Sequence, residues 1–194
     1  MCEKIRQILA GRKKRLLAVG EAVPAAVLIP LFKKDGCLHI LFTKRTETVA
    51  RHKGQISFPG GACNPEDPSL LATALRETFE EVGIREEDVD VLGSLDDIVT
   101  STNFLVSPFV GAIPCPYEFK VCAEEVSELI EVPLRALTDG INVRQEFEIR
   151  GGLLFPVHFY HYEGYVIWGV TARLLTQFVE LLRRGGFRVG DGAC

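Results

Sequence analysis

The chain has 194 residues, of which 47% are hydrophobic and 25% are charged, a balance that suits one globular domain with a hydrophobic core. Its formal net charge of −4 excludes a protein that binds nucleic acid through bulk positive charge. No apolar run reaches the roughly 18 residues that a membrane span requires, and the N-terminus lacks the apolar stretch of a secretory signal. We therefore expect a cytoplasmic protein that binds neither nucleic acid nor membrane.

The cysteines argue for the same compartment. All six are scattered along the chain, and none belongs to a Cys-x-x-Cys pair. This spacing makes a zinc site improbable and favours free thiols in a reducing environment.

The N-terminal segment, residues 3–18, predicts a short amphipathic helix. Its last part is basic, with Arg12, Lys13, Lys14 and Arg15 in succession. A basic helix can bind a membrane or an acidic partner, but basic helix faces are more often solvated, and we expect a solvated face here.

Two apolar runs follow, at residues 24–32 and 37–45. Each is short enough to be a buried strand. The turn residues Lys33 to Gly36 lie between them, so the two runs predict an antiparallel pair of strands.

The next stretch, residues 54–84, combines a strand, a glycine turn and a helix. Residues 55–58 predict a strand that ends at the turn Pro59-Gly60-Gly61. We expect Asp67 to be the N-cap of a helix that begins at Pro68, ends near Val82 and stops at Gly83.

This helix carries an unusual group of charges, Glu77, Glu80 and Glu81. Their spacing of i, i+3 and i+4 predicts that all three lie on one face, opposite the apolar face. Like charges at this spacing repel each other, and the C-terminal end of the helix dipole disfavours anions. Two interpretations stay open, a solvated acidic face and a site for a divalent cation, which prefers converging carboxylate oxygens.

The rest of the chain predicts further strands and a last helix. Residues 89–98 and 105–113 read as strands, and residues 143–168 alternate as a small set of antiparallel hairpins. The last helix should end near Arg184 and bury an apolar face, with Trp168 in the core before it. That face consists of Leu174, Leu175, Phe178, Val179 and Leu182.

Residues 76–84, Arg-Glu-Thr-Phe-Glu-Glu-Val-Gly-Ile, preceded by Gly60-Gly61, resemble the second half of the Nudix box. The first half departs from the usual pattern, because the positions of the box glutamate and glycine fall on Pro68 and Ala62. Asp67 lies one residue from the glutamate position and is a candidate replacement.

Residues 41–61 carry a second resemblance, to the motif that precedes the box in coenzyme A diphosphatases. Eight positions match this motif: Leu41, Thr43, Arg45, Gly54, Phe58, Pro59, Gly60 and Gly61. The second arginine of the motif is replaced by Ala50, with Arg51 beside it. This departure leaves the substrate open.

The resemblance implies a fold, a reaction and a set of site residues. The fold would be a single α/β Nudix domain, an α/β/α sandwich with a mixed β-sheet, with a core at about residues 24–184. The reaction would be metal-dependent hydrolysis of a diphosphate bond in a nucleotide-like small molecule, most simply coenzyme A. Mg²⁺ or Mn²⁺ would be held by Glu77, Glu80, Glu81 and the Gly60 carbonyl, with Glu80 and Glu125 catalytic, Arg76 holding a glutamate in place, and Arg45, Arg51, Phe58 and Gly61 contacting substrate.

Two other functions stay open. One is a Nudix hydrolase for ADP-ribose, a dinucleotide or another nucleotide, and the other is a Nudix-fold module that binds without catalysis. The intact glutamates argue against the binding module. The sequence is compatible with a monomer and with a homodimer.

Overall fold

The computed structural model describes residues 2–17, 20–47, 54–150 and 153–187. The helices are α1 (Cys2–Ala10), α2 (Leu70–Val82), α3 (Leu134–Thr138) and α4 (Gly169–Arg184), with a 3-10 turn at Glu86–Asp88. The strands are β1 (Val23–Lys34), β2 (Cys37–Arg45), β3 (Ile56–Ser57), β4 (Gly60–Ala62), β5 (Asp90–Ser94), β6 (Ile98–Val99), β7 (Phe104–Ala112), β8 (Val126–Pro133), β9 (Val143–Arg150), β10 (Leu153–Tyr162) and β11 (Tyr165–Ile167).

The main sheet is mixed, as expected. Its central order is β3-β2-β1-β7-β5, with β4 on β1, β6 on β7 and β8 on β2. Strands β1 and β7 pair in parallel over a long register, from Val23 opposite Phe104 to Leu31 opposite Ala112. Every other pair in this sheet is antiparallel, including the predicted hairpin of β1 and β2.

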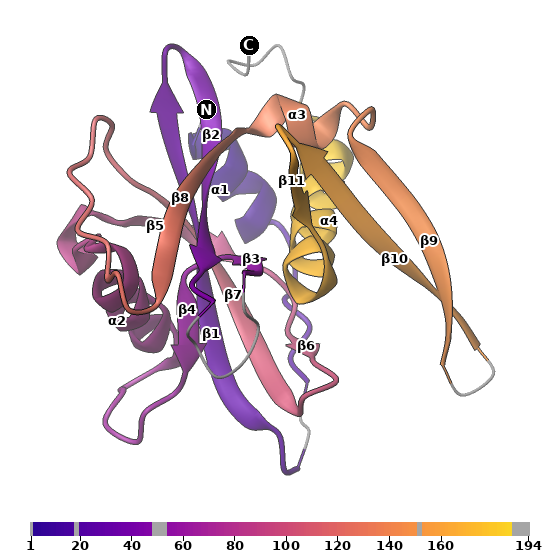
Figure 1. Ribbon diagram of the computed structural model, residues 1–194, viewed down its shortest axis with the longest axis horizontal. Helices are drawn as coiled ribbons and strands as arrows, with labels where there is room; N and C mark the ends of the chain where they lie inside the picture. The colour runs from indigo at the N-terminus through magenta and orange to yellow at the C-terminus, as the bar shows by residue number, and fades with distance from the viewer. Residues whose placement is uncertain (1, 18–19, 48–53, 151–152, 188–194) are drawn as a thin grey trace.

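Helices cover both faces of this sheet (Figure 1). Because side chains alternate along a strand, neighbouring residues of β2 enter different cores. Phe42 belongs to the large core formed with α1 and α4. Leu41 belongs to a smaller core that includes Val82 of α2 and Ile84 just after it. This arrangement is the α/β/α sandwich expected from the sequence.

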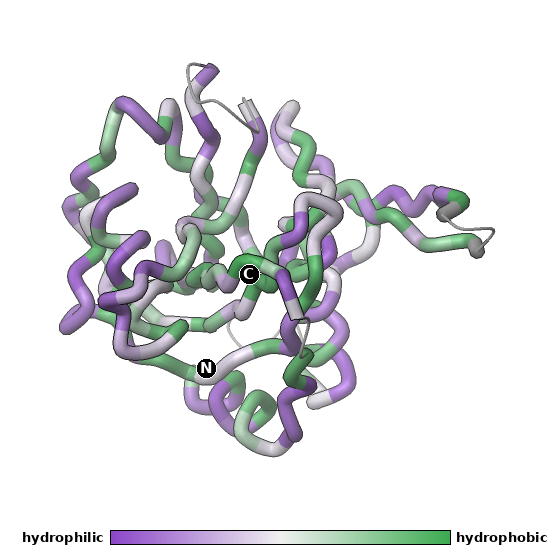
Figure 2. Tube along the Cα trace, turned by 90° about the horizontal axis from the view of Figure 1, so that it is seen from below, coloured by the Kyte–Doolittle hydropathy of each residue, from purple (hydrophilic) through white to green (hydrophobic). Residues whose placement is uncertain are grey.

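A second sheet, of order β11-β10-β9, carries an arm that projects from the body (Figures 1 and 2). The hairpins predicted for residues 143–168 are therefore confirmed. The predicted turn at residues 151–152 lies outside the described residues. The second predicted turn is present, with positive φ angles of 45° at Glu163 and 85° at Gly164. The base of the arm packs on α4 through Tyr160, which is 2% exposed.

The N-terminal helix is shorter than predicted. It ends at Ala10, and the basic residues after it do not form a solvated helical face. Arg12 pairs with Asp96, and the Nζ atom of Lys14 lies 2.7 Å from Oδ1 of Asp97. These ion pairs hold the segment against the loop after β5, which explains why it leaves the helical path.

Helix α2 also begins later than predicted, because Ser69 rather than Asp67 is its N-cap. The Ser69 hydroxyl accepts a hydrogen bond from the Ala72 N–H at 3.1 Å. The helix stops as expected at Gly83, whose left-handed φ of 75° suits glycine. The N–H groups of Lys120 and Cys122 donate to the carbonyls of Val82 and Glu81, so a later loop completes this helix end.

Two smaller expectations need correction. Cys2, Cys63, Cys115 and Cys122 are free thiols, but Cys37 is disulfide-bonded. Trp168, expected in the core, is 47% exposed at the start of α4. The predicted apolar face of α4 is buried as expected. Among the described residues, no helix is long and apolar enough to cross a membrane.

The N-cap assignment predicts a stability change. Replacing Ser69 with Ala should lower the free energy of unfolding by about 1 kcal/mol, because the Ala72 N–H loses its partner. Urea unfolding of both proteins would measure the difference. Ser101→Ala, in an exposed turn, is the matched control and should change stability by less than about 0.5 kcal/mol. Equal losses in the two variants would contradict the assignment.

Candidate functional site

The candidate site lies where α2 crosses β4. Strand β4 pairs with β1 by placing Gly60 opposite Val27 and Gly61 opposite Ala26. A Cβ atom at Gly61 would overlap the Glu77 carboxylate, and one at Gly60 would overlap the backbone of β1. The two glycines therefore let a helix carrying carboxylates approach the strand closely.

Glu81 points into this contact instead of lying on an outer face with the other two glutamates. It is 4% exposed because it follows Ala74 and Thr78 on the buried side of α2. The pKa of the Glu81 carboxyl is raised to about 8, chiefly by burial. The charge of Arg45 and the backbone of Gly60 lower it, and the charges of Glu125 and Glu77 raise it. Among the described residues, the Oε2 atom of Glu81 has no hydrogen-bond partner.

Arg45 reaches Glu81 from the end of β2. Its Nη1 atom lies 3.8 Å from Oε1 of Glu81, which is an ion pair without a hydrogen bond. A bulge between Lys44 and Arg45 shifts the pairing of β2 with β8 at this point, and bulges commonly redirect a side chain. The Nε atom of Arg45 is buried and has no partner among the described residues. Both members of this pair thus retain unused hydrogen-bonding capacity.

Arg76 connects the remaining acidic groups. Its Nε and Nη2 atoms each lie 2.9 Å from an oxygen of Asp67, a bidentate pair. Its Nη1 atom donates to Glu77 at 2.8 Å and to Glu80 at 3.0 Å. The Arg76 guanidinium holds the pKa of Asp67 well below its usual range. Arg76 therefore ties the loop before α2 to two of the glutamates.

Asp67 holds Arg76 in place, a role that its position in the sequence did not predict. Besides Arg76, it accepts hydrogen bonds from the Asn64 N–H and the Thr73 hydroxyl, both at 2.9 Å. It is thus an anchor for the arginine and not the N-cap. The signal in the sequence was an acidic residue beside the displaced box position, and its partner nine residues later was visible only in the structure.

Glu125 comes to the site from the loop before β8. The loop is held by Glu125 itself, whose carbonyl accepts the Thr46 N–H and whose N–H donates to Cys122, both at 3.0 Å. Glu125 is exposed, and its charge raises the pKa of both Glu77 and Glu81. The structure therefore brings Glu77, Glu80, Glu81 and Glu125 into one acidic region.

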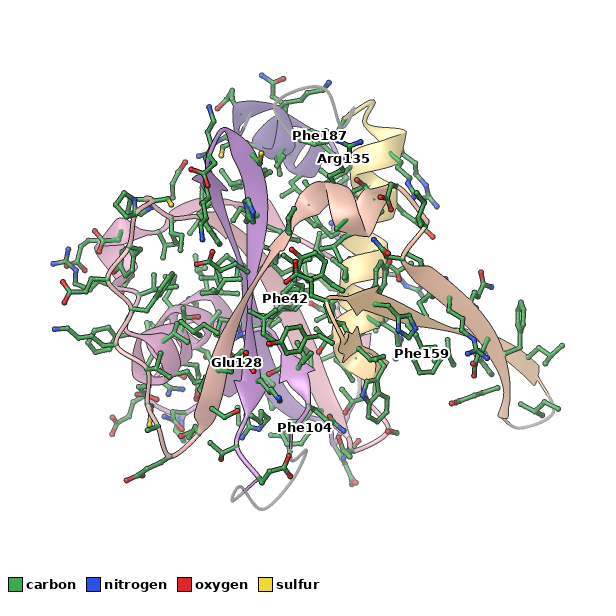
Figure 3. The ribbon with its side chains drawn as sticks, turned by 45° about the horizontal axis from the view of Figure 1, so that its top comes forward. Phe42, Phe104, Glu128, Arg135, Phe159 and Phe187 are labelled. Carbon is green, nitrogen blue, oxygen red and sulfur yellow. The ribbon has the colours of Figure 1, made fainter. Side chains whose placement is uncertain are left out.

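Two further predicted substrate contacts are Phe58 and Arg51. Phe58 is 3% exposed and stacks on Phe42 with ring centroids 4.8 Å apart, so it is a core residue, and its contact with substrate stays a prediction. Figure 3 shows Phe42 in the middle of the molecule. Arg51 lies outside the described residues. The Gly60 carbonyl stays a predicted ligand.

The acidic region fits a divalent cation in its donor chemistry. Glu81 offers an unpaired buried oxygen, and a cation beside it would remove the electrostatic cost of ionising the carboxylates. Among the described residues, no three potential ligand groups already converge as a metal cage. In this structure Arg76 binds Glu77 and Glu80. Metal binding requires these two carboxylates to exchange part of that contact for the ion.

Comparisons with known proteins bear on this site. Residues 22–148 match the model of the NUDIX domain. An uncharacterized Nudix hydrolase, NudL, of Photorhabdus laumondii is 38% identical over 156 residues, covering 80% of this chain and 83% of its own. NudL of Yersinia enterocolitica is 38% identical over 159 residues, covering 80% of each chain.

Solved structures agree in fold. A MutT/nudix family protein from Enterococcus faecalis superposes with a TM-score of 0.51 at 13% identity, covering 97% of this chain and 75% of its own. A binary complex of the Ap4A hydrolase from C. elegans gives a TM-score of 0.50 at 19% identity, covering 57% of this chain and 80% of its own. At these identities the likeness supports the fold alone.

The raised pKa of Glu81 predicts a pH-dependent stability in the metal-free protein. Its pKa is about 8 in the folded state and near its ordinary value, about 4.3, in the unfolded chain. Between these two pKa values, folding therefore takes up a proton. The contribution of Glu81 to the free energy of unfolding is complete below about pH 4 and is lost as the pH rises through 8. With a chelator present, the free energy of unfolding should fall by up to about 1.4 kcal/mol per pH unit in that window.

The matched control is Glu81→Gln, which cannot titrate. Its urea unfolding curve, measured in the same buffers, should lack this part of the pH dependence. The same slope in both proteins would show that Glu81 ionises normally in the folded state.

Proposed function

Because the chain belongs to the Nudix family of hydrolases, we propose that it cleaves the diphosphate bond of coenzyme A or a close derivative. The family and the relatives identify the chain as a hydrolase of diphosphate substrates. The finer assignment rests on the match of residues 41–61 to the coenzyme A diphosphatase motif. The products would be adenosine 3′,5′-bisphosphate and phosphopantetheine.

The observation that carries the proposal is the pair of Arg45 and Glu81. Hydrolysis of a diphosphate needs its charge neutralised and a water molecule positioned for attack. Arg45, with a buried Nε that has no partner among the described residues, is suited to donate to a phosphate oxygen. The Oε2 atom of Glu81 is buried and has no hydrogen-bond partner among the described residues, so Glu81 is suited to bind a cation next to that phosphate.

Nudix hydrolases generally use divalent metal ions, and Glu77, Glu80 and Glu81 are the residues that would hold them here. Mg²⁺ or Mn²⁺, when bound, neutralises phosphate charge and lowers the pKa of the attacking water. In this role Arg76 positions Glu77 and Glu80 through its hydrogen bonds and is itself fixed by Asp67.

In the reaction, water cleaves one of the two bonds between phosphorus and the bridging oxygen of the diphosphate. The water oxygen forms a bond to one phosphorus, the bond from that phosphorus to the bridging oxygen breaks, and the second phosphate leaves with that oxygen. The water proton passes to a carboxylate. Glu80 and Glu125 are the candidates for this base, because both are exposed at the edge of the acidic region.

A second candidate function is hydrolysis of another nucleotide diphosphate, such as ADP-ribose or a dinucleotide. The replacement of the second motif arginine by Ala50 favours it, because that position would then lack a cation for an additional phosphate. A panel of diphosphate substrates, assayed with Mg²⁺ and with Mn²⁺ and resolved by chromatography, distinguishes the two candidates.

Replacing Glu81 with Gln should lower turnover by orders of magnitude, because the amide cannot supply a charged ligand. The fold should persist, since Gln has the same shape. Turnover and circular dichroism would be measured together. The control is Glu180→Gln on the exposed side of α4, which should keep full activity. Full activity of the Glu81 variant, or of the unmodified protein in excess chelator, would contradict the metal-dependent mechanism.

Coenzyme A should be cleaved better than its 3′-dephospho form, because the 3′-phosphate is a dianion that a cationic segment can bind. Losing a hydrogen bond to a charged group costs about 1.5–3 kcal/mol, which corresponds to roughly ten- to hundredfold in kcat/KM. Arg51→Ala should reduce the ratio of kcat/KM for coenzyme A to kcat/KM for the 3′-dephospho form. The exposed control Arg184→Ala should leave this ratio unchanged. Equal kcat/KM values for both substrates in the unmodified protein would favour the second candidate function.

A further inference from the structure

The β9–β10 arm is apolar where it is most exposed. Phe147 is 62% exposed, Ile149 74% and Leu154 67%, although monomeric proteins usually keep such side chains apart or covered. Because Leu154 is the register partner of Ile149, and Pro156 of Phe147, these side chains share one face of the hairpin. Figure 3 shows the side chains of the outer arm extending away from the body. The same face continues inward to Val143 and Tyr160, which pack in the core.

Strand β9 is also an edge strand. In the part of the chain that the structure describes, β10 is its only pairing partner. The His161 N–H donates to the Asn142 carbonyl, so in the antiparallel ladder the even-numbered residues of β9 direct their backbone groups toward β10. The odd-numbered residues, Val143, Gln145, Phe147 and Ile149, therefore direct theirs to the free edge. An edge strand with backbone N–H and C=O groups directed outward is a template for another strand.

We propose that the occupant of this edge is β9 of a second copy of the chain, paired antiparallel about a twofold axis at Gln145. In this register Gln145 lies opposite itself, and Val143 lies opposite Phe147 of the second copy. Both are positions whose backbone groups face the free edge, so the pairing extends the ladder without disturbing β10. The two three-stranded sheets then form one continuous sheet.

Charge selects this register. Arg144 lies opposite Glu146 of the second copy, and the twofold axis repeats the pair. These residues already form an ion pair within one chain, at 2.9 Å between Nη2 and Oε1, so the four side chains make an alternating group on one face. Moving the axis to Phe147 would place Glu146 opposite Glu148, and moving it to Glu146 would place that residue opposite itself. Like charges directly opposite each other are destabilising.

The same register also brings exposed apolar side chains next to one another. The end of each arm lies beside the body of the second copy, with Ile149 opposite Ile141. Ile141 is itself 84% exposed and lies just before β9. The exposed apolar side chains of the arm and of its base are thus brought together by one symmetric contact.

The first test is the oligomeric state of the full chain by sedimentation velocity across a range of concentrations. A dimer is expected for the unmodified chain, and Gln145→Pro should convert it to a monomer. The proline removes a backbone N–H that faces the free edge, so the β9–β10 ladder stays intact, which circular dichroism can check. Gln145→Ala keeps the N–H and should stay dimeric. A monomer in the unmodified chain, or a dimer that survives Gln145→Pro, overturns the proposal.

The second test uses charge reversal and does not depend on proline. Glu146→Arg places arginines opposite each other twice and should raise the dimer dissociation constant about tenfold or more. Adding Arg144→Glu restores opposite charges in the proposed register and should recover most of the affinity. The proposal is overturned if Glu146→Arg leaves the dimer dissociation constant unchanged, or if the double variant dimerises more weakly than the single variant. Either result would assign the contact to another surface or register.

Discussion

The close contact between α2 and β4 is the constraint on which the candidate site depends. Two residues without side chains, Gly60 and Gly61, bring a helix against a strand that is itself paired with the central strand β1. The contact buries the Glu81 side chain, which is 4% exposed. Glu81 consequently loses solvation that Arg45, at 3.8 Å, only partly replaces. The chemistry of the site follows from this desolvation, because a poorly compensated carboxylate is a strong ligand for a cation.

The arginines divide two tasks between them. Arg76 is saturated, with contacts to Asp67, Glu77, Glu80 and the Ala62 carbonyl, so it stabilises the arrangement of the loop and helix. Arg45 is not saturated: it forms an ion pair with Glu81, and its buried Nε lacks a hydrogen-bond partner among the described residues. A saturated arginine is suited to hold protein groups in place, whereas an unsaturated one is suited to a ligand. The contrast supports a site that gives up some stability for binding.

The sequence predicted much of this fold, because most of the evidence was local. The hairpin of β1 and β2, the C-terminal end of α2 at Gly83 and the buried face of α4 follow from apolar periodicity and glycine placement. The errors came from long-range contacts. Asp96 and Asp97, some 80 residues away, draw the basic segment after α1 out of the helix, and Arg76 takes Asp67 away from the cap of α2.

The site was predicted in composition but not in geometry. The glutamates of α2 were identified from their spacing and from the Nudix resemblance, and Arg76 from the resemblance. The structure gathers Glu125 with them. Spacing alone placed Glu81 on the outer face, because periodicity reports which residues share a side of a helix and not which side is covered. Phe58 was assigned to substrate from its motif, but the motif does not reveal that its ring stacks on Phe42 in the core.

The parallel pairing of β1 with β7 has a consequence for how the chain folds. Partners such as Val23 and Phe104 are far apart in sequence, and residues 54–84, with the glycines and the glutamates, lie within the loop that their pairing closes. Closing so long a loop costs conformational entropy before many contacts compensate it, and non-local pairings of this kind slow folding. Strand β4 needs β1 as its partner, so we expect the acidic site to assemble late, after the hairpin of β1 and β2 has formed.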